Sequence, residues 1–143
     1  GTGIQHSEYN KNQNELVKFL QIWIFPNKKN VTPRYDQITL NIAERNNKLQ
    51  QIISPNPEDE GVWIHQDAWF HMGTFEANIQ TEYQFKKAGN GVYAFVLKGD
   101  FIIEGQKLGN RDGFGIWDTN IITIESVSED SEILLMEVPM TLS

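Results

Sequence analysis

The stretch VYAFVLKGDFIIEGQKL (Val92–Leu108) alternates short apolar runs with the glycine turns KGD and EGQ. Valine, isoleucine and phenylalanine favour strands, and glycine and aspartate favour tight turns. The stretch therefore predicts strand, turn, strand, turn. The same pattern of short apolar runs separated by turn residues extends over most of the chain. This pattern is typical of an all-β sandwich or barrel. We read the repeated turns as five or more successive hairpins, which favour a closed antiparallel barrel with few exposed edges.

The further strands predicted on each side share short apolar or alternating patterns. Asn90–Gly91 is a strong hairpin signal. The pattern of residues 43–48 fits either a short helical turn or a loop, and we favour the loop. The acidic run 56–61 predicts a solvated turn. The other expected strands are LVKFLQIWIF (16–25), PRYDQITL (33–40), LQQIIS (49–54), VWIHQDAWFHMGTF (62–75, one strand or two), NIQTEYQF (78–85), NIITIES (120–126) and SEILLMEVP (131–139).

Composition restricts the class of protein. The 143 residues are a usual length for one domain, and the 39% hydrophobic and 11% aromatic contents argue against disorder. No apolar run reaches the ~20 residues of a membrane helix, and the start has no signal-peptide pattern. Cysteine is absent, which excludes disulfides and fits the reducing cytosol where we expect the protein. The net charge of −7 disfavours direct binding of nucleic acid.

Several stretches together resemble one family. They are GTGIQHSEYN (1–10), LQIWIFP (20–26), TPRYDQ (32–37) and the run from Val92 to Asp118 with its RDGFGIWD ending. This set is similar to the pirin family of two-cupin proteins, which includes bacterial members that resemble quercetin 2,3-dioxygenase. The resemblance implies a cupin-type antiparallel β-barrel, a jelly-roll-like double-stranded β-helix. It also implies that residues 1–30 are closing strands of a truncated N-terminal cupin and that residues 31–143 are the C-terminal cupin.

His6 and Glu8 are the candidate metal ligands. Residues two apart on a strand face the same way, so they can present an imidazole and a carboxylate to one ion. That donor pair suits divalent iron, manganese or zinc. In the family, an H-x-H pair and a later H-x-E pair bind one metal, usually iron, and the resemblance matches His6 and Glu8 to the second pair. The chain contains no H-x-H, so we expect an incomplete site that holds no metal by itself.

Other polar candidates have weaker support. His65 and Asp67 form an H-x-D pair, which is either a second metal site or a histidine hydrogen-bonded to a neighbour. His65 and His71 would lie about 20 Å apart on an unbroken strand, so they cannot share an ion. The positions where a cupin carries its metal-binding motifs, 84–91 and 120–123, contain no histidine. We predict no catalytic or cofactor-binding residue in this chain, and we expect its aromatic residues to form core, with a ligand pocket as the alternative.

The resemblance supports three functions. The first is a non-catalytic C-terminal cupin module of a protein whose full-length form is a metal-dependent, quercetinase-type dioxygenase with a phenolic substrate. The second is an interaction module of a pirin-like, redox-responsive regulatory cofactor, and the third is a purely structural module. The cofactor expected in the full-length protein is iron or another divalent metal. No membrane partner is expected, but the apolar strand at 16–25 would leave an unpaired edge, so we predict a homo-oligomer through it.

Overall fold

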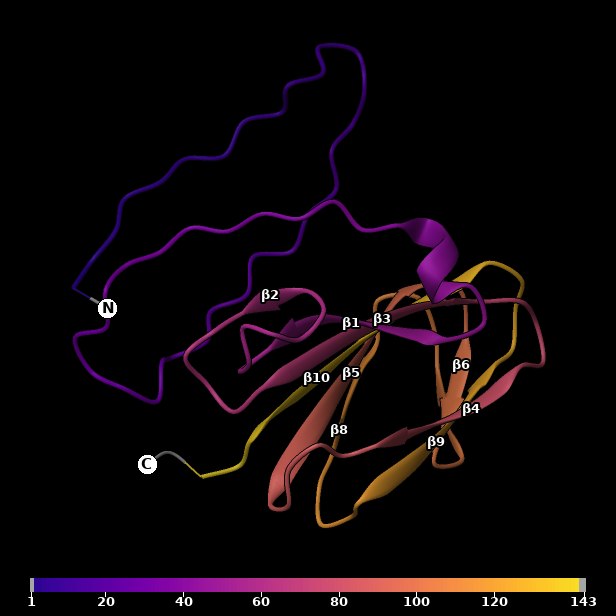
Figure 1. Cartoon of the computed structure of the whole chain (residues 1–143). Helices are drawn as coiled ribbons and strands as arrows, with labels where there is room; N and C mark the ends of the chain where they lie inside the picture. Colours follow the sequence, from indigo (N-terminus) through magenta and orange to yellow (C-terminus); the bar gives the residue numbers. More distant parts are fainter. Residues whose placement is uncertain (1, 142–143) are drawn as a thin grey trace.

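The computed structural model describes residues 2–141 (Figure 1). Ten strands account for most of the regular structure from residue 49 onward, which confirms the all-β prediction. The strands are β1 (Leu49–Ser54), β2 (Val62–Trp63), β3 (Trp69–Phe75), β4 (Gln80–Gln84), β5 (Asn90–Lys98), β6 (Phe101–Ile103), β7 (Gln106–Leu108), β8 (Gly113–Ile116), β9 (Ile121–Ser126) and β10 (Ser131–Pro139). We call residues 49–139 the β domain.

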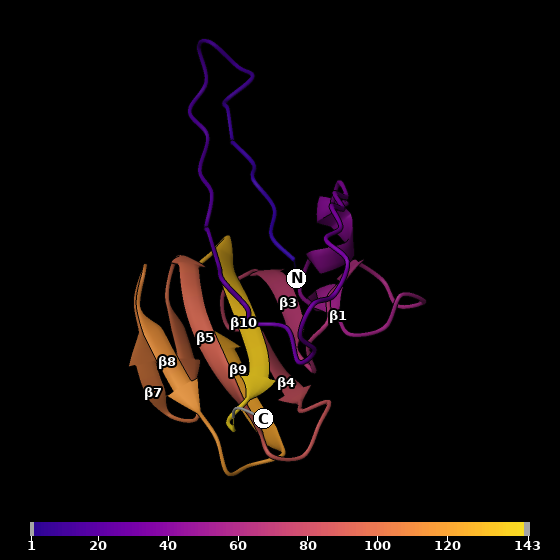
Figure 2. The same cartoon turned by 90° about the vertical axis from the view of Figure 1, so that its left-hand side faces the viewer.

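The strands form two sheets. The six-stranded sheet has the order β2-β1-β3-β10-β5-β8, and the four-stranded sheet has the order β4-β9-β6-β7. The sheets lie face to face as the two layers of a jelly roll (Figures 1 and 2). The chain crosses repeatedly from one sheet to the other, so strands that follow one another in sequence often belong to different layers. The two sheets do not close into one continuous barrel. The predicted jelly-roll architecture is therefore confirmed, and full closure is not.

The prediction of successive hairpins is wrong. Among the described strands, β6 and β7 are the consecutive antiparallel pair, joined by a turn at Glu104 and Gly105. Asn90 and Gly91 begin β5 and do not form a hairpin turn, because the chain turns before them, at residues 86–89. The reason is that β4 and β5 belong to different sheets, so their connection crosses between the layers.

Alternation along the strands separates two apolar clusters. The inner core fills the space between the sheets, and its members include Phe75, Phe101 and Leu135. The outer cluster covers the opposite face of the six-stranded sheet, with Phe70 and Leu134 at its centre. Side chains two apart on a strand share a face, so Phe75 and His71 of β3 point between the sheets while Phe70 points away. Both faces of this sheet are therefore apolar.

The predicted strands at 16–25 and 33–40 are not formed. Both segments run as irregular or extended chain beside the β domain (Figures 1 and 2). Ile24 packs against the outer cluster, whereas Leu16 and Trp23 are 96% and 81% exposed. An apolar run becomes a strand only where another strand accepts its backbone hydrogen bonds, and residues 16–25 have no such partner within the described chain. The boundary at residues 30 and 31 stays a prediction.

A single 3₁₀ turn precedes the β domain. It is η1 (Ile42–Arg45), capped by the Asn41 side chain, which accepts a hydrogen bond from the Ala43 amide at 3.2 Å. The helical alternative for this region is therefore the correct one. No helix within residues 2–141 is long or apolar enough to span a membrane.

Candidate functional site

His6 and Glu8 lie on the exposed chain that precedes the β domain. His6 Nε2 is 3.7 Å from Glu8 Oε1, and both side chains are more than half exposed. Imidazole and carboxylate are suitable donors for a divalent transition metal, so the pair fits two positions of such a site. No third metal-binding side chain gathers with them in the part of the chain that the structure describes.

The H-x-D pair is divided between other contacts. The His65 ring packs edge-on against Trp63, with 4.8 Å between the ring centres. The Asp67 carboxylate forms an ion pair with Lys87. These contacts favour the interpretation of His65 as a packed histidine.

The structure reveals a buried carboxylate network that the sequence reasoning missed. Glu137 of β10 is completely buried. It accepts hydrogen bonds from the Tyr83 hydroxyl at 2.7 Å and from the Asn90 amide at 2.9 Å. The backbone amides of Lys86 and Lys87 also donate to it, at 2.9 to 3.0 Å. Glu137 therefore fixes the connection between β4 and β5 against the end of β10.

A sequence signal for this network existed. Ile133, Leu135 and Glu137 alternate along β10, and the first two belong to the inner core. A carboxylate in the third position of an inward-facing series must find donors, because an unpaired buried charge is very costly. The pattern could therefore have predicted a buried glutamate, but not which residues donate to it.

His71 lies beside this network. Its ring contacts the Tyr83 ring edge-on, with centres 4.9 Å apart, and the residue is 5% exposed. Burial, and then the positive charge of Lys86, lower the pKa of His71 to about 4. Burial, and then the hydrogen bond to Glu137, raise the pKa of Tyr83 far above its usual range. Both rings are therefore neutral at pH 7.

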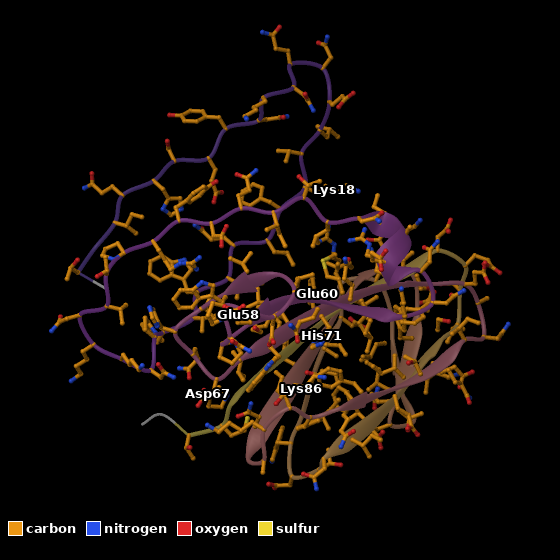
Figure 3. The ribbon with its side chains drawn as sticks, viewed as in Figure 1. Lys18, Glu58, Glu60, Asp67, His71 and Lys86 are labelled. Carbon is orange, nitrogen blue, oxygen red and sulfur yellow. The ribbon has the colours of Figure 1, made fainter. Side chains whose placement is uncertain are left out.

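His71 and Lys86 line a cavity of about 580 Å³ in the β domain, which we call the mouth cavity. In the view of Figure 3, His71 lies between Glu60 and Lys86, which also line it. Its other lining residues come from η1, the bend before β1, β1 itself, the turn at residues 56–61 (the acidic turn) and β3: Glu44, Lys48, Leu49, Gln50, Gln51, Asp59 and Trp69.

A larger groove of about 1070 Å³ lies on the other side of the six-stranded sheet, and we call it the outer groove. Residues 17–24 form one wall, and the outer cluster forms its floor, with Phe70 and Met72 from β3. This groove is mainly apolar, in contrast to the charged mouth cavity.

Comparison with known proteins places this fold. The sequence profile of the quercetinase C-terminal cupin domain matches residues 51–138. Quercetin 2,3-dioxygenase of Escherichia coli K12 is 37% identical over 139 residues, covering 97% of this chain and 58% of that protein. A pirin-like protein of Caulobacter vibrioides is 32% identical, covering 96% of this chain and 58% of that protein. The chain thus spans little more than half the length of these relatives.

Solved structures agree with the sequence matches. The E. coli bacterial pirin YhhW in complex with nickel(II) aligns with a TM-score of 0.74 and 33% identity, over 83% of this chain and 49% of that one. A second YhhW structure aligns with a TM-score of 0.76 and 32% identity, over 85% and 50%. The fold and the sequence therefore give the same assignment: this chain belongs to the pirin-like quercetin 2,3-dioxygenase family and carries its C-terminal cupin domain.

Proposed function

We propose that the β domain is a non-catalytic cupin module of a longer, metal-dependent, quercetinase-type dioxygenase. In this proposal His6 and Glu8 supply two of the ligands to the metal, which is iron or another divalent ion. Relatives that are named quercetin 2,3-dioxygenase and the nickel(II) complex of YhhW support it. The substrate would be a phenol of the quercetin class.

The packing of the β domain is the observation that carries the proposal. Apolar side chains fill the space between its sheets, including Phe75, Phe101 and Ile122, which are at most 1% exposed. The buried carboxylate there, Glu137, already accepts hydrogen bonds from four residues. Its lone pairs are therefore committed to protein donors, whereas the donors of His6 and Glu8 are free to reach an ion.

The two residues would have different roles. The neutral imidazole of His6 would donate a nitrogen lone pair, and the Glu8 carboxylate would offset part of the positive charge. When bound, the metal would supply Lewis-acid activation of the substrate or of O₂. The β domain would hold the chain that follows His6 and Glu8 in place, because Ile24 packs on the outer cluster.

Replacing His6 with alanine tests this function in the longer protein of this proposal, which would also carry the remaining metal ligands. We expect bound metal to fall at least tenfold, because loss of a ligand is more severe than the 10–100-fold cost of losing an outer-shell partner. Oxygen consumption with quercetin should fall with it. Metal analysis and an oxygen electrode measure the two effects. His65→Ala is the matched control and should retain both, whereas stoichiometric metal in the His6 variant would contradict the assignment.

A specific observation favours the predicted homo-oligomer as a second role of this chain. In the leading segment, defined as residues 16–25, Leu16, Phe19 and Trp23 are 65–96% exposed beside the apolar outer groove. Contiguous exposed apolar surface marks association sites. We propose that two copies of this chain associate through the leading segment.

Light scattering across a dilution series checks this association. The chain should be dimeric at micromolar concentration, and the double substitution Phe19→Ser and Trp23→Ser should make it monomeric. Tyr35→Ser is the control, since Tyr35 is 77% exposed but lies outside the segment. A monomeric parent chain would show that the segment does not mediate association.

A further inference from the structure

We propose that the mouth cavity binds a small organic carboxylate, whose carboxylate group lies between His71 and Lys86 and whose apolar body lies against Trp69 and Leu49. This site is separate from His6 and Glu8, and the proposal does not depend on the dioxygenase assignment. It rests on the buried ring of His71, on the Lys86 ammonium group, which has no ion-pair partner among the described residues, and on the cavity that both residues line.

His71 is the first recognition element. Its Nδ1 atom is buried and has no hydrogen-bond partner among the described residues. A buried N–H is rarely left unpaired, while an unpaired acceptor is tolerated more often. The neutral ring therefore carries its proton on Nε2. Because Nδ1 is enclosed and the ring lines the cavity, Nε2–H is the group that can donate to a ligand there.

Lys86 supplies the charge. Its backbone amide donates to Glu137, so the start of its side chain is held at the edge of the cavity. Its ammonium group lies 6.0 Å from the centre of the Tyr83 ring and makes no ion pair among the described residues. Its charge also acts on His71, because it contributes to the lowered pKa of that residue. Two donors, one of them cationic, therefore face the same space, and carboxylate is the acceptor that suits them.

Carboxylates outnumber lysines in the lining of the mouth cavity, with Glu44, Asp59 and Glu60 against Lys48 and Lys86, so the positive charge is confined to the side of Lys86. Glu44 forms an ion pair with Lys48 at 3.3 Å. Asp59 accepts a hydrogen bond from the Asn56 amide at 3.0 Å. Glu60 also lines the cavity, from the turn at residues 56–61. Lys48 is therefore paired with a carboxylate, whereas Lys86 lies near the ring of Tyr83 and lines the cavity together with His71.

The walls of the cavity favour an organic ligand over an inorganic ion. Trp69 and Leu49 line it, and neither is completely buried by the protein. An aromatic or aliphatic body could bury this apolar surface while the carboxylate meets the two donors. Benzoate has both parts, and benzamide is the same ring without the charge.

Titration of the 143-residue chain with benzoate and with benzamide tests the proposal at pH 6.5 and constant ionic strength, and a pH series at saturating ligand gives the pKa of His71. We expect saturable shifts of the His71 ring resonances with benzoate only. The bound anion stabilises the imidazolium form, so saturating benzoate should raise the pKa of His71 by about one unit or more. Benzamide should leave that pKa at its starting value.

Lys86→Gln should weaken benzoate binding about tenfold or more, because it removes the charged donor. The adjacent Lys87→Gln is the matched control: Lys87 pairs with Asp67, and its loss should not alter benzoate affinity. Lys86 is exposed, so its substitution leaves the fold intact, and unchanged backbone resonances verify this. Equal affinity for benzoate and benzamide, or equal affinity in the two lysine variants, would overturn the proposal.

Discussion

Replacing Glu137 with glutamine should lower the free energy of unfolding by about 3–5 kcal/mol, since hydrogen bonds to buried charges are strong and donors left unpaired are costly. Every group around Glu137 donates: Tyr83, Asn90 and the amides of Lys86 and Lys87. Glutamine replaces one acceptor oxygen with an NH₂ group, which must face N–H or O–H groups. Urea unfolding followed by tryptophan fluorescence measures the loss.

Glu132 provides the control for this experiment. It lies on the same strand, β10, but it is only partly buried. Glu132→Gln should change stability by less than about 0.5 kcal/mol, as is usual for substitutions outside buried networks. A Glu137 variant as stable as the Glu132 variant would show that the buried network does not hold the β4–β5 connection.

Gly61→Ala should destabilise the β domain by about 2–5 kcal/mol, through left-handed backbone strain together with overpacking. Gly61 precedes β2 and has φ of +96°, and a Cβ there would lie 2.4 Å from the Ile52 carbonyl oxygen. Ile52 is at the point where β1 shifts register against β3, so the backbone approach belongs to that irregularity. Thermal unfolding by circular dichroism measures the effect.

Gly89 separates strain from crowding. Its φ is +82°, but a Cβ there would meet nothing within 4 Å. Gly89→Ala should therefore cost only about 1–2 kcal/mol, the strain alone. Equal losses at the two glycines would mean that the contact with Ile52 contributes nothing.

The local pattern was sufficient to predict individual strands. In β4, Thr81 and Tyr83 are at least partly buried while Gln80, Glu82 and Gln84 are exposed, as the alternation predicts. The chain also turns at Gly99 and Gly105, as the glycine positions predict, and both residues have positive φ. Such features depend on neighbours two or three residues away, so a single sequence contains the information.

Residues 16–25 show where local pattern fails. Their composition favours a strand, but a strand also needs a partner for its backbone groups, and the described chain offers none. The metal assignment for His6 and Glu8 has the same character, because the family resemblance suggested it and the structure brings only the two side chains together. It stays a prediction for the experiment on His6.

The sequence by itself determined the strand-rich composition, the inward and outward alternation and the family resemblance. Each of these depends on residues that are close together in the chain. Only the tertiary structure decided that β3 pairs with β10, that β4 pairs with β9, and that Glu137 meets donors some 50 residues away in the chain. These pairings require distant segments to close on one another, and their register follows from packing the whole core. The mouth cavity, with His71 beside Lys86, is a product of that closure.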